Sequence, residues 1–284
     1  MATFSNQATL TYLDTETNSN VVTGELLDVL SITKTALSPS YRPGGKITYV
    51  ISILNTGASP FGALCLADNL GAYVFEGATL VPLSYMEDSL RLYVNGILEP
   101  SPSIAFDTCL HISDLSVPAG GNLLLVYDTV VNSFAPLSEG STITNTVRFS
   151  GCGISAPLTA SATVRAESGA FLTISKSLFP TAVTENERLT YTFVIQNTGN
   201  APAILTDHVV ITDTFDPALT NITVTANGDL WTSPDYYTYN PLTGVFTTAE
   251  GKITVPAATY TQDAETGRFV MTPGVFVVQV TGTI

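Results

Sequence analysis

Hydrophobic and polar residues alternate along much of the chain, which is the pattern of β-strands with one buried face. The alternation is clearest in two segments, whose apolar positions are Ile47, Tyr49, Ile51 and Ile53 in the first and Leu189, Tyr191, Phe193 and Ile195 in the second. Turn sequences such as Pro43-Gly-Gly45 and Asn227-Gly228 separate the strands. The pattern predicts an all-β chain built of immunoglobulin-like β-sandwiches.

The same pattern of residues occurs twice in the chain. Lys34 and Lys176 lie 142 positions apart, and several flanking motifs match at or near that offset in the same order. The matching segments are Ser31-Ile-Thr-Lys-Thr35 with Thr173-Ile-Ser-Lys-Ser177, Asn55-Thr-Gly57 with Asn197-Thr-Gly199, and Leu66-Ala-Asp68 with Ile211-Thr-Asp213. We therefore expect two tandem sandwiches, unit one over residues 31–165 and unit two over residues 172–284.

The two units differ after their matching segments 124–127 and 276–280. Unit one continues through a strand at 143–149 and another at 158–165, whereas unit two stops at Ile284. The opening of the chain resembles the strands that unit two lacks, with a strand at 4–12, a turn at 15–20 and a second strand after it. We predict that residues 1–30 are donor strands that complete unit two of a neighbouring molecule.

Strand donation of this kind would join molecules head to tail. A sandwich without its closing strand exposes an unpaired edge and an apolar groove, and a donated strand covers both. Since donor and acceptor lie at opposite ends of the chain, the contact propagates as a fibre unless it closes into a ring. The predicted donor face consists of Phe4, Ala8, Leu10 and Tyr12, with Asn6 on the same face. The alternative is a strand folded back onto its own unit two, in a monomeric surface adhesin or carbohydrate-binding module.

Polar residues interrupt three otherwise apolar strand faces of unit one. Alternation places Lys34, Asp68 and Asn145 at inward positions. Unit two repeats the first two as Lys176 and Asp213, and only Asn6 of the opening strand offers the third. A buried charge without a partner is unfavourable, so these side chains are expected to meet.

Two outcomes fit such a meeting. In one, the lysine and aspartate form a buried ion pair that the asparagine caps with hydrogen bonds. In the other, the neutral lysine attacks the asparagine carboxamide, and Asp68 or Asp213 shuttles protons as ammonia leaves. The isopeptide bonds would then join Lys34 to Asn145 within a molecule and Lys176 to Asn6 between molecules. Apart from this autocatalytic step we expect no enzyme activity, no small-molecule substrate and no cofactor.

The order Lys34, Asp68, Asn145 resembles that of bacterial pilin and surface immunoglobulin-like domains with self-generated Lys–Asn isopeptide bonds. The repeated Asn-Thr-Gly, followed by Asp68-Asn-Leu70 and Asp213-Thr-Phe215, is similar to the prokaryotic surface repeat called domain of unknown function 11. The opening strand resembles, more loosely, subunits of clostridial spore appendages. These resemblances imply a structural protein outside the cell, on a cell or spore surface, in a chain that shows no signal peptide.

Composition narrows the possible partners to other copies of the chain. The net charge of −14 would repel nucleic acid and anionic membranes. No apolar run approaches the roughly 18 residues of a membrane-spanning helix. The aromatic tract 231–251, which contains Tyr236, Tyr237 and Tyr239, is predicted to pack on the sandwich, with carbohydrate binding as the alternative.

The cysteines and histidines give no pattern typical of a metal site. Cys65, Cys109 and Cys152 are predicted to be buried, inert thiols or, for Cys152 in a hairpin tip, to form an intermolecular disulfide. His111 and His208 fall in different units, which argues against a histidine-based metal cluster or catalytic triad. The sequence therefore predicts no metal site.

Overall fold

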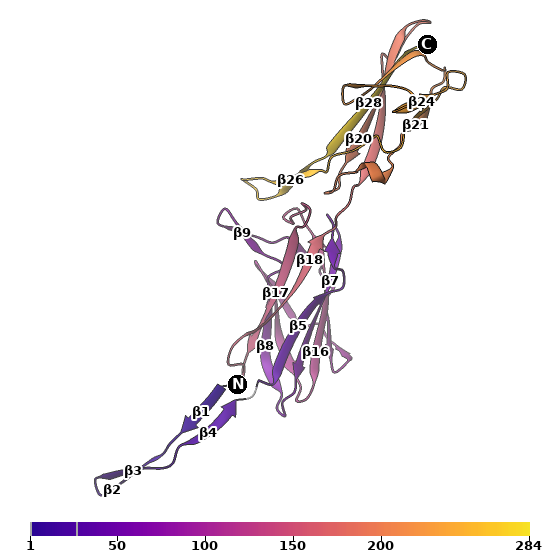
Figure 1. Ribbon diagram of the computed structural model, residues 1–284. Coiled ribbons are helices and arrows are strands. Elements are labelled where there is room, and N and C mark those ends of the chain that lie inside the picture. Colours follow the sequence, from indigo (N-terminus) through magenta and orange to yellow (C-terminus); the bar gives the residue numbers. More distant parts are fainter. Residues whose placement is uncertain (1, 27) are drawn as a thin grey trace.

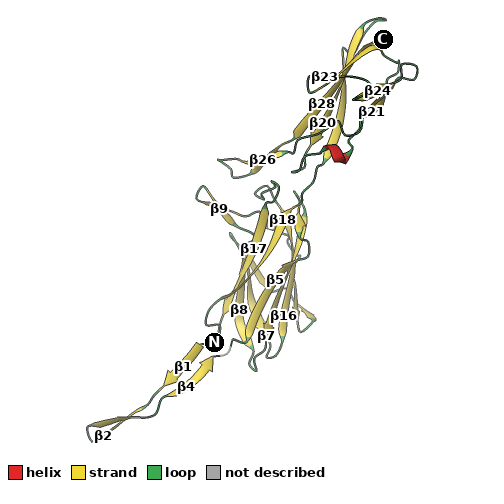
Figure 2. Ribbon diagram, viewed as in Figure 1, coloured by secondary structure: helices red, strands yellow, loops and turns green. Residues whose placement is uncertain are grey.

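The computed structural model describes residues 2–26 and 28–284, and its regular structure is almost entirely β (Figures 1 and 2). The one helical turn within these residues is the short 3₁₀ helix η1 (Leu205–Asp207). Within the same residues, no helix has the length and apolar character required to cross a bilayer. The prediction of an all-β chain with β-sandwich architecture is confirmed.

Unit one consists of two packed sheets. The first has the order β13 (Ile97–Glu99), β12 (Arg91–Val94), β16 (Asn122–Val131), β7 (Lys46–Asn55) and β5 (Leu30–Ala36), with β11 (Leu83–Tyr85) also paired with β16. The second has the order β14 (Ser103–Phe106), β15 (Leu110–Val117), β8 (Phe61–Asp68), β17 (Thr142–Gly151), β18 (Leu158–Ala166) and β6 (Ser40–Tyr41). A small hairpin of β9 (Tyr73–Phe75) and β10 (Ala78–Leu80) lies outside them. Alternate residues of both sheets point inward and form one hydrophobic core.

Unit two repeats the first of these sheets and part of the second. Its larger sheet has the order β19 (Leu172–Phe179), β20 (Arg188–Asn197), β28 (Gly274–Thr283), β22 (Thr220–Ala226) and β23 (Asp229–Trp231). Its smaller sheet contains β21 (Thr212–Thr214), β25 (Val245–Thr248) and β24 (Tyr237–Tyr239). A separate hydrophobic cluster fills this unit. The hairpin of β26 (Thr259–Gln262) and β27 (Phe269–Thr272) extends from it toward unit one (Figure 1).

The aromatic tract of unit two packs against its core. Trp231 and Tyr237 are buried, and the rings of Trp231 and Tyr236 stack with centroids 5.3 Å apart. The Tyr239 hydroxyl donates a hydrogen bond to the Leu219 carbonyl oxygen at 2.8 Å. The prediction that these aromatic residues pack on the sandwich is confirmed.

The repeated Asn-Thr-Gly motif forms the same structure in both units. Asn55 and Asn197 are fully buried, and each side chain closes its own turn. Thr56 and Thr198 donate backbone hydrogen bonds to the residue just before the first strand, Val29 at 2.9 Å and Phe171 at 3.0 Å. The asparagine Nδ2 donors reach Ser59 and Pro118 at 2.9 and 2.8 Å in unit one, and Ala201 and Pro256 at 2.8 and 3.0 Å in unit two. The motif therefore fastens the incoming chain to each sandwich.

The first residues form a long two-stranded hairpin that stands apart from both units (Figure 1). In this N-terminal hairpin β1 (Ala2–Asn6) pairs with β4 (Val22–Leu26), and β2 (Thr9–Tyr12) pairs with β3 (Thr15–Asn18). Leu13 and Asp14 have φ values of 48° and 60° and close a two-residue turn. The predicted turn at 15–20 is therefore wrong, because the chain reverses earlier and residues 15–18 become part of the return strand.

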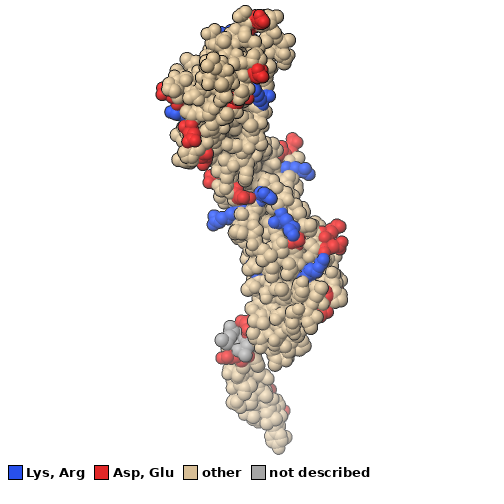
Figure 3. All heavy atoms as spheres, turned by 90° about the vertical axis from the view of Figure 1, so that its right-hand side faces the viewer, with Lys and Arg blue, Asp and Glu red and all other residues tan. Residues whose placement is uncertain are grey.

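The N-terminal hairpin exposes its apolar side chains to solvent. Phe4, Leu10 and Tyr12 are 61%, 64% and 70% exposed. A two-stranded hairpin is marginally stable in water without a surface to cover it. On the face shown in Figure 3 it carries no basic side chain, consistent with a sequence whose first Lys or Arg is Lys34.

The two units contact each other at the end opposite the hairpin. The Asn200 Nδ2 donates to the Leu137 carbonyl oxygen at 3.0 Å, and the Phe269 backbone N–H donates to the Ser133 carbonyl oxygen at 2.8 Å. Unit one thus lies between the N-terminal hairpin and unit two (Figure 1). The hairpin does not fold back onto unit two of its own chain.

Candidate functional site: two lysine–aspartate pairs

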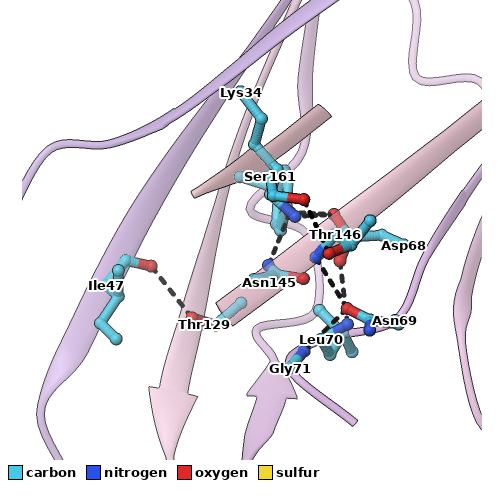
Figure 4. Close-up of polar contacts among 11 residues, drawn as sticks. Lys34, Ile47, Asp68, Asn69, Leu70, Gly71, Thr129, Asn145, Thr146 and Ser161 are labelled. Atoms are coloured by element: carbon cyan, nitrogen blue, oxygen red, sulfur yellow. Dashed lines mark hydrogen bonds and ion pairs between the residues drawn. The ribbon is translucent and has the colours of Figure 1, made fainter. Parts of the chain in front are cut away.

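Unit one brings Lys34, Asp68 and Asn145 together in its core (Figure 4). The side chains come from β5, β8 and β17, three strands of two facing sheets. The Lys34 Nζ lies 2.6 Å from the Asp68 Oδ2, and neither side chain is accessible to solvent. The inward positions predicted from alternation are therefore the observed ones.

Burial weakens the preference of Lys34 for its proton. Desolvation lowers the Lys34 pKa from 10.5 to about 8, although the neighbouring Asp68 carboxylate acts in the opposite direction. The Tyr127 hydroxyl also donates a hydrogen bond to the Asp68 Oδ2, and burial raises the Tyr127 pKa well above its usual value. Asp68 Oδ1 accepts from the Leu70 backbone N–H at 2.9 Å. The carboxylate is thus held by three donors from different parts of the chain.

Asn145 lies beside this pair with half of its carboxamide unpaired. Its Nδ2 donates to the Tyr127 hydroxyl at 3.4 Å, which is a long hydrogen bond. Its Oδ1 is buried and has no hydrogen-bond partner within the described residues, and the same holds for the Tyr49 hydroxyl. An unpaired buried carbonyl is uncommon and unfavourable. The side-chain carbonyl of Asn145 is therefore a group of this cluster whose hydrogen bonding is incomplete.

Unit two holds the corresponding pair in a more open setting. The Lys176 Nζ lies 2.5 Å from the Asp213 Oδ2, but these side chains are 38% and 20% exposed. The ammonium group lies over the Tyr191 ring, 4.4 Å from its centroid. Val280 stands where unit one has Tyr127, since each is the cross-strand partner of the equivalent tyrosine on the neighbouring strand. No asparagine of unit two lies at the position of Asn145 within the described residues.

Within the described residues, unit two has no counterpart of the β17 and β18 strands that cover the first pair. In unit one β8 pairs with β15 on one side and β17 on the other, and β18 packs over β5. Among the described residues, β21 of unit two pairs with β25 alone, and β19 pairs with β20 alone. Leu172 and Ile174 are consequently 37% and 57% exposed, whereas their counterparts Leu30 and Ile32 pack against the core. Unit two therefore has an open strand edge beside an uncovered apolar face.

Asn6 is not part of either cluster in the single chain. It lies on β1, is exposed, and pairs with Val22 of β4. The predicted donor residues Phe4, Ala8, Leu10 and Tyr12 are exposed on the same hairpin. The structure thus brings Lys34, Asp68 and Asn145 together, pairs Lys176 with Asp213, and leaves Asn6 apart from them.

The thiols and histidines differ from their predicted surroundings. Cys65 and Cys152 are exposed and free, so the interpretation of buried, inert thiols is wrong for them. The ligand atoms of Asp107, Cys109 and His111 lie within 4.8 Å of one another, so the sequence prediction missed a potential metal-ligand cluster. Its signal was the segment Asp-x-Cys-x-His, in which three different metal-ligand residues recur at every second position.

Comparisons with known proteins identify similar architectures and no family. No protein-family model matches the chain and no curated protein matches it, so the resemblance to domain of unknown function 11 stays a prediction. Similar solved structures include the major pilin BcpA of Bacillus cereus, with 9% identity, coverage of 96% of this chain and 73% of that chain, and a TM-score of 0.37. The C-terminal fragment of the Streptococcus agalactiae major pilin GBS80 has 10% identity, coverage of 87% and 91%, and a TM-score of 0.36.

A family 123 glycoside hydrolase from Clostridium perfringens is also similar, at 11% identity and a TM-score of 0.32. Here the match covers 49% of this chain and spans only 27% of the hydrolase chain. Pilins, surface proteins and enzymes thus occur together among the similar structures, all at low TM-scores. The functional argument therefore comes from the geometry of the chain itself.

Proposed function

We propose that the chain is a structural subunit of an extracellular filament, in which the N-terminal hairpin of one molecule completes unit two of the next. One observation carries this proposal. Unit two has an open edge and an uncovered face where unit one has the β17–β18 hairpin, and the chain also presents an isolated, apolar, two-stranded hairpin. Unit two lacks strands to cover its open edge, and the hairpin lacks a sheet to cover its apolar side chains.

The alignment of Asn6 with Asn145 gives the register of the donated strand. In unit one Val147 lies opposite Asp68 and Phe149 opposite Leu66. At the same register Ala8 would lie opposite Asp213, and Leu10 opposite Ile211. Leu10 would then enter the core of unit two beside β21, the strand that carries Asp213. Tyr12 would continue the donated strand, and the hairpin would become the new edge of the sheet.

The pairing within the hairpin supports the same alignment. In unit one Ile143 lies opposite Val164, two branched residues that fill the core together. In the N-terminal hairpin Phe4 lies opposite Gly24, and its ring covers the glycine so closely that a Cβ there would lie 2.4 Å from the ring. A phenylalanine opposite a glycine would thus take the place of two residues of medium size. The side-chain volume that enters the core would stay similar.

Within unit one we propose an isopeptide bond between Lys34 and Asn145. The neutral Lys34 amine attacks the Asn145 side-chain carbonyl carbon, the new C–N bond forms, and the carboxamide nitrogen leaves as ammonia. Asp68 takes a proton from the attacking amine and delivers it to the leaving nitrogen. The lowered Lys34 pKa and the unpaired Asn145 carbonyl oxygen support this chemistry.

Between molecules the same chemistry would join Lys176 to Asn6. In the single chain the Lys176–Asp213 pair is partly solvated, and the inserted hairpin would cover it and bring the Asn6 amide to the position that Asn145 occupies in unit one. The covalent step would thus follow assembly, because only the assembled unit buries the amine. In unit two Val280 takes the place of Tyr127, whose hydroxyl donates to Asp68 in unit one.

Electron microscopy of the purified chain and of a variant without residues 2–26 tests the filament. We expect fibres from the chain and dispersed, folded monomers from the deletion variant. Asp14→Ala, at the exposed hairpin tip, is the matched control and should still form fibres. Fibres from the deletion variant would overturn donation by the hairpin, and monomers from the full chain would favour the surface-adhesin or carbohydrate-binding alternative.

Denaturing gels and intact masses test the covalent step separately. Each bond should lower the mass by one ammonia, about 17 Da. Assembled material should give a ladder that disappears in Lys176→Ala and in Asn6→Ala while fibres remain visible by microscopy. A ladder that persists in both variants contradicts the proposed cross-link without affecting the non-covalent assembly.

A further inference from the structure

Unit one carries a cluster of three different metal-ligand side chains at the tip of one hairpin. Asp107, Cys109 and His111 occupy alternate positions where β14 turns into β15, and their ligand atoms all lie within 4.8 Å of one another. The Asp107 Oδ1 and His111 Nε2 are 3.2 Å apart. This cluster lies outside both lysine–aspartate pairs and has no part in the proposed assembly.

The two sheets of unit one hold the hairpin in a defined conformation. Phe106 lies opposite Leu110 at the start of the ladder, and Leu110 and Ile112 are fully buried. Because successive side chains on a strand point to opposite faces, His111 is directed away from the core that Leu110 and Ile112 enter, and Cys109 lies in the bend just before β15. The Cys109 backbone N–H donates to the Asp107 Oδ1 at 2.8 Å, which fixes the aspartate across the turn. The three ligands are thus positioned by packing that does not depend on a metal.

The spacing suits a small tetrahedral ion. Zinc binds carboxylate oxygen and imidazole nitrogen at about 2.0–2.1 Å, so two such ligands of a tetrahedral site lie about 3.3 Å apart. The observed separation of 3.2 Å between the Asp107 oxygen and the His111 nitrogen agrees with this value. A thiolate as third ligand favours zinc over magnesium or calcium, which prefer oxygen ligands alone.

We infer that Asp107, Cys109 and His111 form a zinc-binding site on the surface of unit one. Three protein ligands leave the fourth position of the ion for water, as in zinc sites that remain accessible from outside. The exposed fractions of 45% for the His111 side chain and 68% for the Asp107 side chain allow an ion to enter directly from solvent.

Titration of the full chain with Co²⁺ tests the site, since a thiolate–cobalt bond gives an absorption band that carboxylates and water do not. We expect one equivalent of Co²⁺ per chain with thiolate charge-transfer absorption, displaced by an equimolar amount of Zn²⁺. Cys109→Ser should abolish the thiolate band, and His111→Asn should weaken zinc binding at least tenfold. All three ligands are at the surface of a hairpin whose core residues are unchanged, so these variants should fold.

Two matched variants separate this site from the other thiols and histidines. Cys65→Ser removes another exposed thiol, and His208→Asn removes a histidine whose Nδ1 lies 3.6 Å from a Glu250 carboxylate oxygen. Both should retain the full band and affinity. Absence of the band in the native chain, or its persistence in Cys109→Ser, would overturn the proposal.

Discussion

Each unit contains a lysine–aspartate pair, and the pair is fully covered in unit one but only partly covered in unit two. In unit one Lys34 and Asp68 have no solvent contact and lie beside Asn145, whereas Lys176 and Asp213 remain partly exposed. The sheets that carry the lysines have the same strand order, so the difference lies in the second sheet. Unit one has β17 and β18 there, and unit two has an open edge.

The lysine–aspartate pair forms even where the strands that would cover it are not in place. The strands that bear lysine and aspartate form without the strand that bears asparagine, as unit two demonstrates. In unit one it is the β17–β18 hairpin that excludes water from the polar cluster. The chain also presents a two-stranded hairpin at its other end, and the proposed assembly would use that hairpin to complete unit two.

The largest expected contrast is in the free energy of unfolding when either lysine is removed. In an Asn145→Ala background, where the proposed bond to Lys34 does not form, Lys34→Met leaves Asp68 buried without its cation and should destabilise unit one by about 3–5 kcal/mol. Lys176→Met removes a partly exposed pair and should change unit two by about 1 kcal/mol or less. Urea unfolding of chains without residues 2–26 measures both, with the fluorescence of Trp231, the only tryptophan, reporting on unit two. Equal losses would contradict the difference in burial.

The rate of bond formation in unit one should depend on pH through Lys34. Its pKa is lowered to about 8, so the reactive neutral amine becomes more abundant as the pH rises toward that value. Between pH 6 and pH 8 the rate should increase about fifty-fold, and it should rise by no more than about a further factor of two above pH 8. The measurement is the loss of ammonia by intact mass after refolding of unreacted chain at each pH. A rate that falls with rising pH would exclude the amine as nucleophile.

A synthetic peptide of residues 2–26 should stabilise unit two alone. Added to the chain without those residues at a hundredfold excess over its dissociation constant, it should raise the stability of unit two by about 2.7 kcal/mol. Trp231 fluorescence should follow this shift, while the unfolding of unit one stays unchanged. A peptide with Phe4→Asp is the control and should lose the effect, because it would place a charge in the core.

The smallest expected contrast between the two units concerns a feature that they share. Asn55→Ala and Asn197→Ala each remove the same set of turn-closing hydrogen bonds and should destabilise their own units by similar amounts, about 1–3 kcal/mol. Chemical denaturation of each variant checks this. A large loss for one and none for the other would contradict the equivalence of the two motifs.

Local patterns predicted much of this molecule because strands have a period of two residues. Alternation identified the inward positions of Lys34, Asp68 and Asn145, and the repeat identified the matching residues of unit two. Tyr127 was not predicted as a partner of Asp68, since it lies 59 residues away and meets the aspartate only when the sheets pack. That contact depends on tertiary packing, which alternation does not contain.

Other features depend on backbone geometry that composition does not reveal. Leu13-Asp14 lacks the glycine that usually marks a two-residue hairpin turn, so the turn was expected later in the chain. The cluster of Asp107, Cys109 and His111 was missed because its spacing differs from common metal motifs, and two of its residues lie in the bend between β14 and β15.

An engineered disulfide tests the central claim most directly. In unit one Arg148 lies opposite Ala67, and the same register places Thr9 of a donor opposite Thr212 of the acceptor. Opposed residues of antiparallel strands have Cα atoms about 4.5–5.5 Å apart, within the range of a disulfide. With the native cysteines replaced by serine, chains carrying Thr9→Cys and chains carrying Thr212→Cys should form a mixed disulfide dimer on oxidation. Thr11→Cys with Thr212→Cys, out of register, should not. No dimer from the first pair, or an internal bond when both substitutions are in one chain, would contradict donation between molecules.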